Sequence, residues 1–306
     1  MAKRIVSFLP SATELLYELN ADDMLYGVTH ECLYPNDAKN KPRIIDSVFD
    51  PEKMSSQEID QTTCSLLKDG KDIFTLNEKN LLDAKPDLII SQNTCEVCAA
   101  HTNQLSRATE ILENKPTIHS MDPHNITEIF DGVIEIAKLI GKEKEGQKLK
   151  SSLEKRLEKI KNNSILEKPK VLALEWVDPL FTSGHWVPEM ISIAGGINLV
   201  SKTGEHSRKM TLDEAIKSQP DYIIVMPCGF DTNRAVSEYN ESLGKNESWK
   251  NLSAVKNNHV FAVDANSYFS KPSIRTVTGI EILAKILHPD IFTDIQVPEN
   301  SYKVIE

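Results

Sequence analysis

Long apolar runs are missing from this sequence. Although 40% of its 306 residues are hydrophobic, no run approaches the ~20 residues that a membrane-spanning helix needs, so we expect no membrane insertion. The first residues also contain neither a long apolar segment nor the small-residue cleavage site of a secretory leader. As written, the chain is therefore expected in the cytoplasm, whereas a chain that had lost a leader would work outside it.

Positive charge is in deficit, with 35 Lys and Arg residues against 45 Asp and Glu residues and a formal net charge of −10. Nucleic acids and anionic membrane surfaces are polyanions that would repel such a chain, so neither is expected as a partner. Four enzyme signatures are also missing: Gly-X-Gly-X-X-Gly, the Walker loop, Gly-X-Ser-X-Gly and His-Glu-X-X-His. These absences favour a binding protein over an enzyme.

Cysteine is scarce as well, with five residues, and in a cytoplasmic chain these should be thiols unless a metal or redox role claims them. Four of them follow predicted strands, and with a nearby histidine they offer thiolate and imidazole ligands that suit zinc or iron. A redox dithiol and ordinary buried thiols are alternative interpretations of the Cys-X-X-Cys pair. Cys64 lies on a predicted helix and is interpreted as structural. The predicted metal ligands are His30, Cys32, Cys95, Cys98 and Cys228.

The N-terminal part of the chain alternates predicted strands and helices, a pattern typical of an α/β fold with a mostly parallel sheet. The run from Pro10 to Glu14 predicts a capping box, with Ser11 as the N-cap and Glu14 three residues later. Strands are predicted over residues 4–9, 25–28, 88–91 and 117–120, and helices over 11–19 and 57–69.

A charged helical pattern interrupts this alternation and predicts helices over residues 125–140 and 143–161. The segment 215–224 then repeats the order of 81–90, in which a helix ends before Pro-Asp and a buried strand follows. We therefore predict two related α/β lobes joined by a long rigid helix, with a ligand cleft between them. The predicted parts are an N-terminal lobe at 1–123, a connecting helix at 124–163, a C-terminal lobe at 164–292 and a tail at 293–306.

The most informative segment runs from residue 171 to 196, where a buried strand enters a loop crowded with polar and aromatic side chains. Glu175, Trp176, His185 and Trp186 all lie in this loop. Ligands of open α/β sheets bind where strands end, and aromatics beside a few charges suit a large, flat, partly polar molecule. The loop at 264–272 follows another predicted strand and brings aromatics, an amide and a cation to the same predicted cleft.

Several ordered motifs resemble the helical-backbone (class III) substrate-binding proteins, and the cobalamin-binding branch is the most similar. The motifs are Ile5-Val6-Ser7-Phe8-Leu9-Pro10-Ser11-Ala12-Thr13-Glu14-Leu15, Lys85-Pro86-Asp87-Leu88-Ile89-Ile90, Phe181-Thr182-Ser183-Gly184, Ala194-Gly195-Gly196 and the stretch 260–272. The resemblance covers about residues 4–290. It implies two α/β lobes on a rigid helix, with a corrinoid, haem or other metal chelate held between them, and a monomeric protein.

Carried over by position, the resemblance also implies which residues bind the ligand and a transporter. One acidic residue on each lobe of this family docks onto an ABC permease. The equivalent positions here fall at or beside Lys79, with Glu78 adjacent, and at Asp213, with Glu214 next to it, so Glu78, Asp213 and Glu214 are the implied docking residues. The implied ligand-lining residues are Ser11, Gln92, Trp176, Phe181, Tyr268, Phe269 and Lys271, to which the loop composition adds Glu175, His185 and Trp186.

Two hypotheses of different classes follow. In the first, a cobalamin-like corrinoid or related metal chelate sits among the aromatics, and His185 or His30 supplies an axial nitrogen to its metal. In the second, the cysteine cluster holds zinc or iron in a metal-binding protein or metalloenzyme, with Glu175 or Glu31 as general base. A scaffold that has lost its ligand is a third interpretation, which the density of polar groups in the predicted cleft disfavours.

Overall fold

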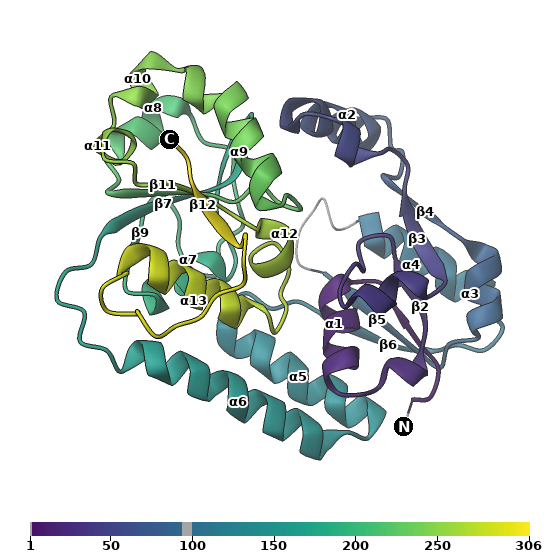
Figure 1. Ribbon diagram of the computed structural model, residues 1–306. Helices are drawn as coiled ribbons and strands as arrows, with labels where there is room; N and C mark the ends of the chain where they lie inside the picture. The colour runs from purple at the N-terminus through teal and green to yellow at the C-terminus, as the bar shows by residue number, and fades with distance from the viewer. Residues whose placement is uncertain (1, 94–99) are drawn as a thin grey trace. The chain divides into compact units, whose positions relative to one another are not determined.

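A computed structural model describes residues 2–93 and 100–306 of the chain (Figure 1). The chain divides into two compact units, and within the described residues each unit contains one six-stranded sheet covered by helices. This confirms the predicted two-lobed α/β fold. The first unit comprises Met1–Met54, Glu58–Pro123 and Thr127–Ser152, and the second comprises Ser55–Gln57, His124–Ile126 and Leu153–Glu306.

The sheet of the first unit has the strand order β4-β3-β2-β1-β5-β6, and only β3 and β4 pair antiparallel among its described neighbours. Its central strands β1 and β5 are buried along nearly their whole length, which is typical of parallel strands with both faces covered. The strands are β1 (Ile5–Ser7), β2 (Leu25–Thr29), β3 (Arg43–Ser47), β4 (Phe74–Leu76), β5 (Leu88–Gln92) and β6 (Thr117–Met121). The helices are α1 (Pro10–Glu18), α2 (Ser56–Lys68), α3 (Glu78–Ala84) and α4 (Ala100–Ile111), of which α2 has its first two residues in the second unit.

Helix α1 begins earlier than its sequence predicts. Its N-cap is Leu9, with extended backbone and no side-chain cap, and Pro10 is the first helical residue. Proline suits that position because its fixed φ fits a helix and its missing N–H needs no partner there. The capping-box prediction is therefore wrong, and the hydroxyl of Ser11 is buried without a hydrogen-bond partner in the described protein.

The two predicted connecting helices are confirmed almost to the residue as α5 (Ile126–Ile140) and α6 (Glu143–Lys161). Gly141 separates them with φ +74°, a left-handed conformation that ends helices and favours glycine. Within the first unit the two helices approach closely, since a Cβ on Gly146 would lie 2.5 Å from the Cβ of Ala137. The boundary between the two units falls inside α6, after Ser152.

The sheet of the second unit has the order β12-β11-β10-β7-β8, with β9 also paired to β7. Helices α8 to α11 cover one face, and α7 and α13 cover the other (Figure 1). The strands are β7 (Lys170–Val177), β8 (Leu180–Thr182), β9 (Ile197–Asn198), β10 (Tyr222–Val225), β11 (Val260–Val263) and β12 (Tyr302–Val304). The helices are α7 (Val187–Ile193), α8 (Leu212–Lys217), α9 (Thr232–Glu241), α10 (Glu247–Lys250), α11 (Ser253–Lys256), α12 (Ala265–Tyr268) and α13 (Thr276–Leu287).

The repeated helix-Pro-Asp-strand segments match in backbone conformation as well as in sequence. Lys85 and Gln219 precede the two prolines with φ +45° and +46°, the left-handed conformation at the end of each helix. The carboxylate of Asp87 then accepts a hydrogen bond from the backbone N–H of Arg4, and that of Asp221 accepts one from Lys170. In each unit the aspartate thereby fixes the start of the neighbouring strand, β1 or β7.

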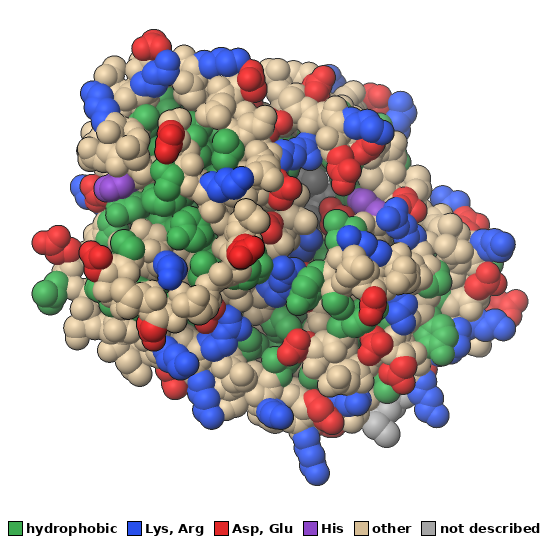
Figure 2. All heavy atoms as spheres, in the orientation of Figure 1, with side chains coloured by type: hydrophobic (Ala, Val, Ile, Leu, Met, Phe, Trp, Pro, Cys, Tyr) green, Lys and Arg blue, Asp and Glu red, His purple; other side chains and the backbone are tan. Residues whose placement is uncertain are grey.

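Three further observations concern the surface, the helices and the end of the chain. Lys, Arg, Asp and Glu side chains are interspersed over the face drawn in Figure 2. Of the helices in the described residues, none has the length and apolar character to cross a membrane. The predicted C-terminal tail contributes β12, which pairs antiparallel with β11 in the second unit.

Candidate functional site

The loops that leave β7, β10 and β11 form the candidate site of the second unit. These strands are parallel, so their carboxyl ends lie at one edge of the sheet, the edge at which open α/β sheets bind ligands. Backbone hydrogen bonds tie the loops together. The N–H of Cys228 donates to Glu175 O at 3.1 Å, and that of Asn266 donates to Phe230 O at 3.0 Å. The three loops therefore form one connected surface.

An aromatic platform stands on this surface, consisting of Trp176, Phe230 and Arg234. The ring centroids of Trp176 and Phe230 are 5.2 Å apart, and the guanidinium of Arg234 lies 3.7 Å from the Phe230 centroid. The Trp176 indole N–H donates to the carbonyls of Ser56 at 3.2 Å and Asp178 at 3.1 Å, which fixes the orientation of its ring. Trp176 stays partly exposed, whereas Phe230 is 2% exposed, so of these two rings only Trp176 offers a face to a ligand. Phe230 and Arg234 were not identified from the sequence.

Three other predicted ligand residues are placed in the interior of the second unit. Trp186, Tyr268 and Phe269 are 4%, 9% and 2% exposed. The indole N–H of Trp186 donates to Phe269 O at 2.9 Å, which ties the start of α7 to the loop after β11. In this conformation their rings offer little surface to a ligand. Phe181 and Lys271 remain partly exposed, and Lys271 Nζ donates to Asn266 Oδ1 at 2.6 Å.

Glu175 links two segments of the candidate site. One carboxylate oxygen accepts the N–H of Gly184 at 3.1 Å, and the other accepts the hydroxyl of Ser207 at 2.8 Å. Burial raises the pKa of the Glu175 carboxyl above its usual value, although these two hydrogen bonds act in the opposite direction. In this conformation Glu175 therefore joins the segments of Gly184 and Ser207 through its two hydrogen bonds.

Replacing Glu175 by Gln should remove a pH dependence of stability while keeping two hydrogen bonds, because the amide oxygen can accept from Gly184 N–H and the amide nitrogen can donate to the Ser207 hydroxyl oxygen. Because the pKa is raised on folding, the contribution of the protonated carboxyl is complete below its unfolded pKa of about 4.3 and is lost as the pH rises through the folded value. We expect Glu175→Gln to raise the free energy of unfolding at pH 7 but not at pH 4, measured by urea denaturation. Glu214→Gln is a control of opposite sign, because Arg208 lowers the pKa of Glu214. Parallel pH profiles for wild type and Glu175→Gln would contradict the expectation.

Three histidines from separate segments gather beside the Gly184 turn. The ring centroids of His185 and His206 are 5.0 Å apart, those of His124 and His206 are 6.0 Å apart, and those of His124 and His185 are 6.2 Å apart. All three belong to the second unit. Of these, only His185 was identified from the sequence, because the three positions follow no short spacing that could signal a cluster.

The predicted metal ligands of the first unit do not form a cluster among the described residues. The thiol of Cys32 is buried and lies 3.1 Å from Thr13 Oγ1, and the ring of His30 packs 5.8 Å from that of Phe74. Cys228 is exposed and belongs to the second unit. Cys95 and Cys98 lie outside the described residues. The cysteine-cluster hypothesis therefore stays a prediction. Cys64, expected to be structural, is exposed on α2.

The remaining predicted residues have the following places. Gln92 ends β5 and is partly exposed. Glu78 and Glu214, predicted to dock a permease, each form an ion pair with an arginine of their own unit, Arg107 and Arg208. Asp213 lies beside Glu214 in the first turn of α8. Exposed pairs of this kind are weak, so a partner could replace either arginine.

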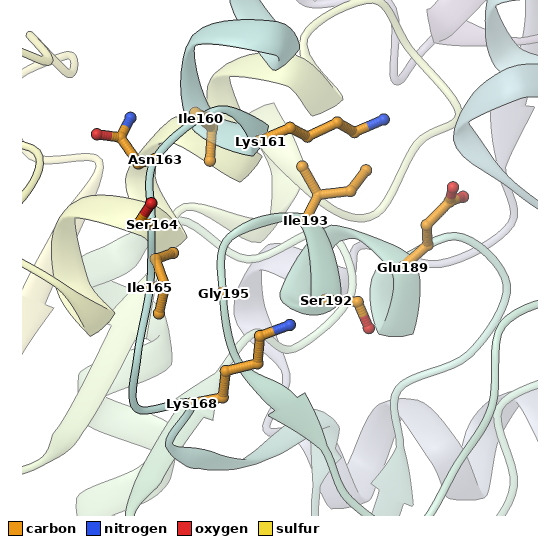
Figure 3. Close-up of a pocket in the computed structure, with 10 residues that line it drawn as sticks. All are labelled: Ile160, Lys161, Asn163, Ser164, Ile165, Lys168, Glu189, Ser192, Ile193 and Gly195. Atoms are coloured by element: carbon orange, nitrogen blue, oxygen red, sulfur yellow. The ribbon is translucent and has the colours of Figure 1, made fainter.

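A pocket of about 610 Å³ opens elsewhere on the second unit (Figure 3). It is built from the end of α6, the chain entering β7, and α7, and not from the loops at the carboxyl edge. Lys161 and Lys168 bring positive charge to it, and Glu189 uses its carboxylate to accept the N–H of Ile126 at 2.8 Å. The pocket is therefore separate from the aromatic platform.

Comparison with known proteins identifies the family. The model of the family described as "Periplasmic binding protein" matches residues 5–267. The chain belongs to this family. The membership and the two-lobed fold confirm the resemblance to substrate-binding proteins inferred from the sequence.

The individual relatives have low sequence identity to this chain. The uncharacterized ABC transporter substrate-binding lipoprotein YvrC of Bacillus subtilis is 25% identical, over 95% of this chain and 82% of its own length. The vitamin B12-binding protein of Vibrio cholerae is 23% identical, over 92% of this chain and 87% of its own. The structure of Staphylococcus aureus IsdE complexed with heme superposes with a TM-score of 0.69 at 18% identity, covering 93% of this chain and 98% of that one. The expectation of a cytoplasmic location finds no support in the relatives described as lipoproteins or periplasmic proteins.

Proposed function

We propose that this protein is the extracytoplasmic substrate-binding component of an ABC transporter and that its ligand is a corrinoid of the cobalamin type. The observation that carries the proposal is the partly exposed ring of Trp176, which packs against the buried ring of Phe230 at the carboxyl edge of the second sheet. A tetrapyrrole-like ring is large, flat and polar at its rim, and aromatic faces beside a few charged groups suit such a molecule.

The relatives support a metal chelate as the ligand class. The vitamin B12-binding protein matches nearly the whole chain, whereas the heme-bound structure is similar at the level of the fold. Heme is therefore the competing chelate, and the test must include it. The metalloenzyme hypothesis is not favoured by these relatives, which are named as binding proteins.

Titration with cyanocobalamin and, in parallel, with hemin distinguishes the two chelates. The purified protein should shift the visible absorption spectrum of added cyanocobalamin and give a saturable heat of binding with one ligand per chain. Hemin should bind at least about tenfold more weakly, a difference of about 1.4 kcal/mol. Tighter hemin binding would overturn the corrinoid assignment but keep the chelate-binding function, and no saturable binding of either chelate would overturn both.

The transporter part of the proposal places Glu78, Asp213 and Glu214 at the permease surface. Their positions in the first turns of α3 and α8 leave the carboxylates near the surface of each unit. Arginines on a permease would compete there with Arg107 and Arg208 for the same carboxylates. Charge reversal at Glu78 and Glu214 should abolish transport in cells while leaving cobalamin binding by the purified protein unchanged.

A further inference from the structure

The pocket of Figure 3 lies wholly within the second unit, and the proposed corrinoid site does not include it. Its volume of about 610 Å³ falls within the range of small-molecule sites. The loop 163–168 forms one wall and α7 forms the other, with Gly195 between them (Figure 3). Ile160, at the end of α6, also lines the pocket and is 1% exposed. Three segments that are separate from the carboxyl-edge loops therefore build this pocket.

The two walls of the pocket are connected at their base. The N–H of Ile197, just after α7, donates to Pro169 O at 2.8 Å, which ties the end of the loop to the segment after α7. Gly195 has φ +89°, and its carbonyl oxygen lies 3.2 Å from His288 Nε2. A Cβ on Gly195 would overlap Ile165 Cδ1, so the glycine leaves room for that side chain in the loop wall. Contacts of the protein itself therefore build the frame of the pocket.

Positive charge gathers at this pocket although the chain is acidic overall. Residues 159–170 contain four lysines and one glutamate, whereas the whole chain has a formal net charge of −10. Lys161 and Lys168 line the pocket, and within the described part of the chain neither forms an ion pair. Figure 3 shows Lys161 and Glu189 extending to the same side of the pocket, so their charges partly offset each other. Lys168 extends from the loop wall toward Ser192, and its ammonium is therefore the group best placed to attract an anion.

We propose that this pocket binds an amphipathic anion, a molecule with one carboxylate or phosphate head group and a single short aliphatic chain. The head group lies beside the Lys168 ammonium, and the chain packs on the side chains of Ile165 and Ile193, which are both partly exposed. Lysine binds either head group as a point charge, so the two anions share the chemistry that the pocket recognises. The inference goes beyond the proposed corrinoid ligand and does not depend on it, because no lining residue belongs to the aromatic platform.

Calorimetric titration of the purified protein with octanoate, octyl phosphate and octylammonium tests the proposal. We expect at least one of the two anions to saturate one site per chain with a Kd below about 1 mM, and octylammonium to give no saturable heat. The anion that binds more tightly identifies the head group. Lys168→Ala should weaken anion binding at least about tenfold, because it removes the charge beside the head group. Lys256→Ala is the matched control, since this exposed lysine ends α11 on the opposite face of the sheet from α7, and its loss should leave the affinity unchanged.

A variant that fills the pocket separates a binding pocket from a charged surface. Ser192→Phe keeps both lysines but should place a ring in the pocket, and we expect it to weaken anion binding at least about tenfold. Ser192 is exposed, so this change should leave the thermal unfolding temperature close to that of the wild type. The proposal is overturned if neither anion saturates a site, if octylammonium binds as tightly as the anions, or if Lys168→Ala or Ser192→Phe leaves the affinity unchanged.

Cyanocobalamin titrations of the same proteins keep this proposal distinct from the proposed function. Because the pocket and the aromatic platform share no residue, Lys168→Ala and Ser192→Phe should bind cyanocobalamin as tightly as the wild type does. Loss of anion binding in these variants with cyanocobalamin binding retained supports the second site. A wild type that binds an anion but no cyanocobalamin would overturn the corrinoid assignment and leave the anion pocket in place.

Discussion

Gly184→Ala is expected to lower the free energy of unfolding by about 3 kcal/mol or more, because overpacking costs about 1–3 kcal/mol and the change breaks hydrogen bonds as well. A Cβ at this position would lie 2.4 Å from the backbone N of Ser207 and 2.8 Å from both Glu205 O and the backbone carbon of His206. Backbone atoms cannot rotate away as a flexible side chain can. The methyl group must therefore push the 205–207 segment outward and break its connection to Glu175.

Urea denaturation measures this cost, and Gly132→Ala is the matched control. The nearest neighbour of a Cβ at Gly132 is the terminal Cε of Met121 at 3.2 Å, which can move aside. Gly132 also lies inside helix α5, where alanine is favoured over glycine by about 0.5–1 kcal/mol. We expect the control to change stability by less than about 1 kcal/mol. A similar small change for Gly184→Ala would contradict the close packing of the two segments.

The Gly184 variant also tests whether the ring contact between His185 and His206 depends on the packing of these two segments. Displacing the 205–207 segment moves His206 away from His185, since the hydrogen bond between His185 N and Glu205 O connects the two loops. The glycine, the partly buried carboxyl of Glu175 and the left-handed backbone of His185 therefore belong to one packed arrangement. No one of them would explain the arrangement alone.

The sequence predicted the structure best where local sequence patterns determine the conformation and tertiary contacts do not override them. The apolar spacing of three and four predicted α5 and α6 to within a residue, because these helices bury one stripe each. The Pro-Asp repeat predicted two equivalent helix-to-strand turns, and both prolines follow a left-handed residue in the structure. The α/β fold followed from this alternation of elements.

Prediction from the sequence failed where contacts with residues distant in the chain determine the start of a helix or the burial of a side chain. Ser11 has the composition of an N-cap, but Pro10 begins the helix before it. Trp176 and Trp186 look equivalent in the sequence, yet one remains partly exposed and the other is 4% exposed beneath Phe269 O. Aromatic composition predicts burial and stacking equally well, so only the packing of the loops separates the two roles. The contribution of Phe230 to the platform depends on that packing as well.

The second large effect is expected on the ligand. Trp176→Ala should weaken cyanocobalamin binding at least about thirtyfold, because truncating a central aromatic side chain of a binding surface commonly costs 2 kcal/mol or more. The loss has two sources that one variant cannot separate. The ring supplies stacking area next to Phe230, and its N–H holds the ring against the carbonyls of Ser56 and Asp178.

Trp176→Phe separates these sources, since it keeps an aromatic face and removes the N–H. If the face carries the affinity, Trp176→Phe should bind within about fivefold of the wild type, which corresponds to less than 1 kcal/mol. The control is Trp249→Phe, in which a fully buried indole that donates to the Tyr239 hydroxyl is replaced in the core. That change should lower the stability without altering the affinity of the folded protein. Equal affinities for the wild type and Trp176→Ala would remove the platform from the binding site and leave the partly exposed Phe181 and Lys271 as the remaining candidates on the second unit.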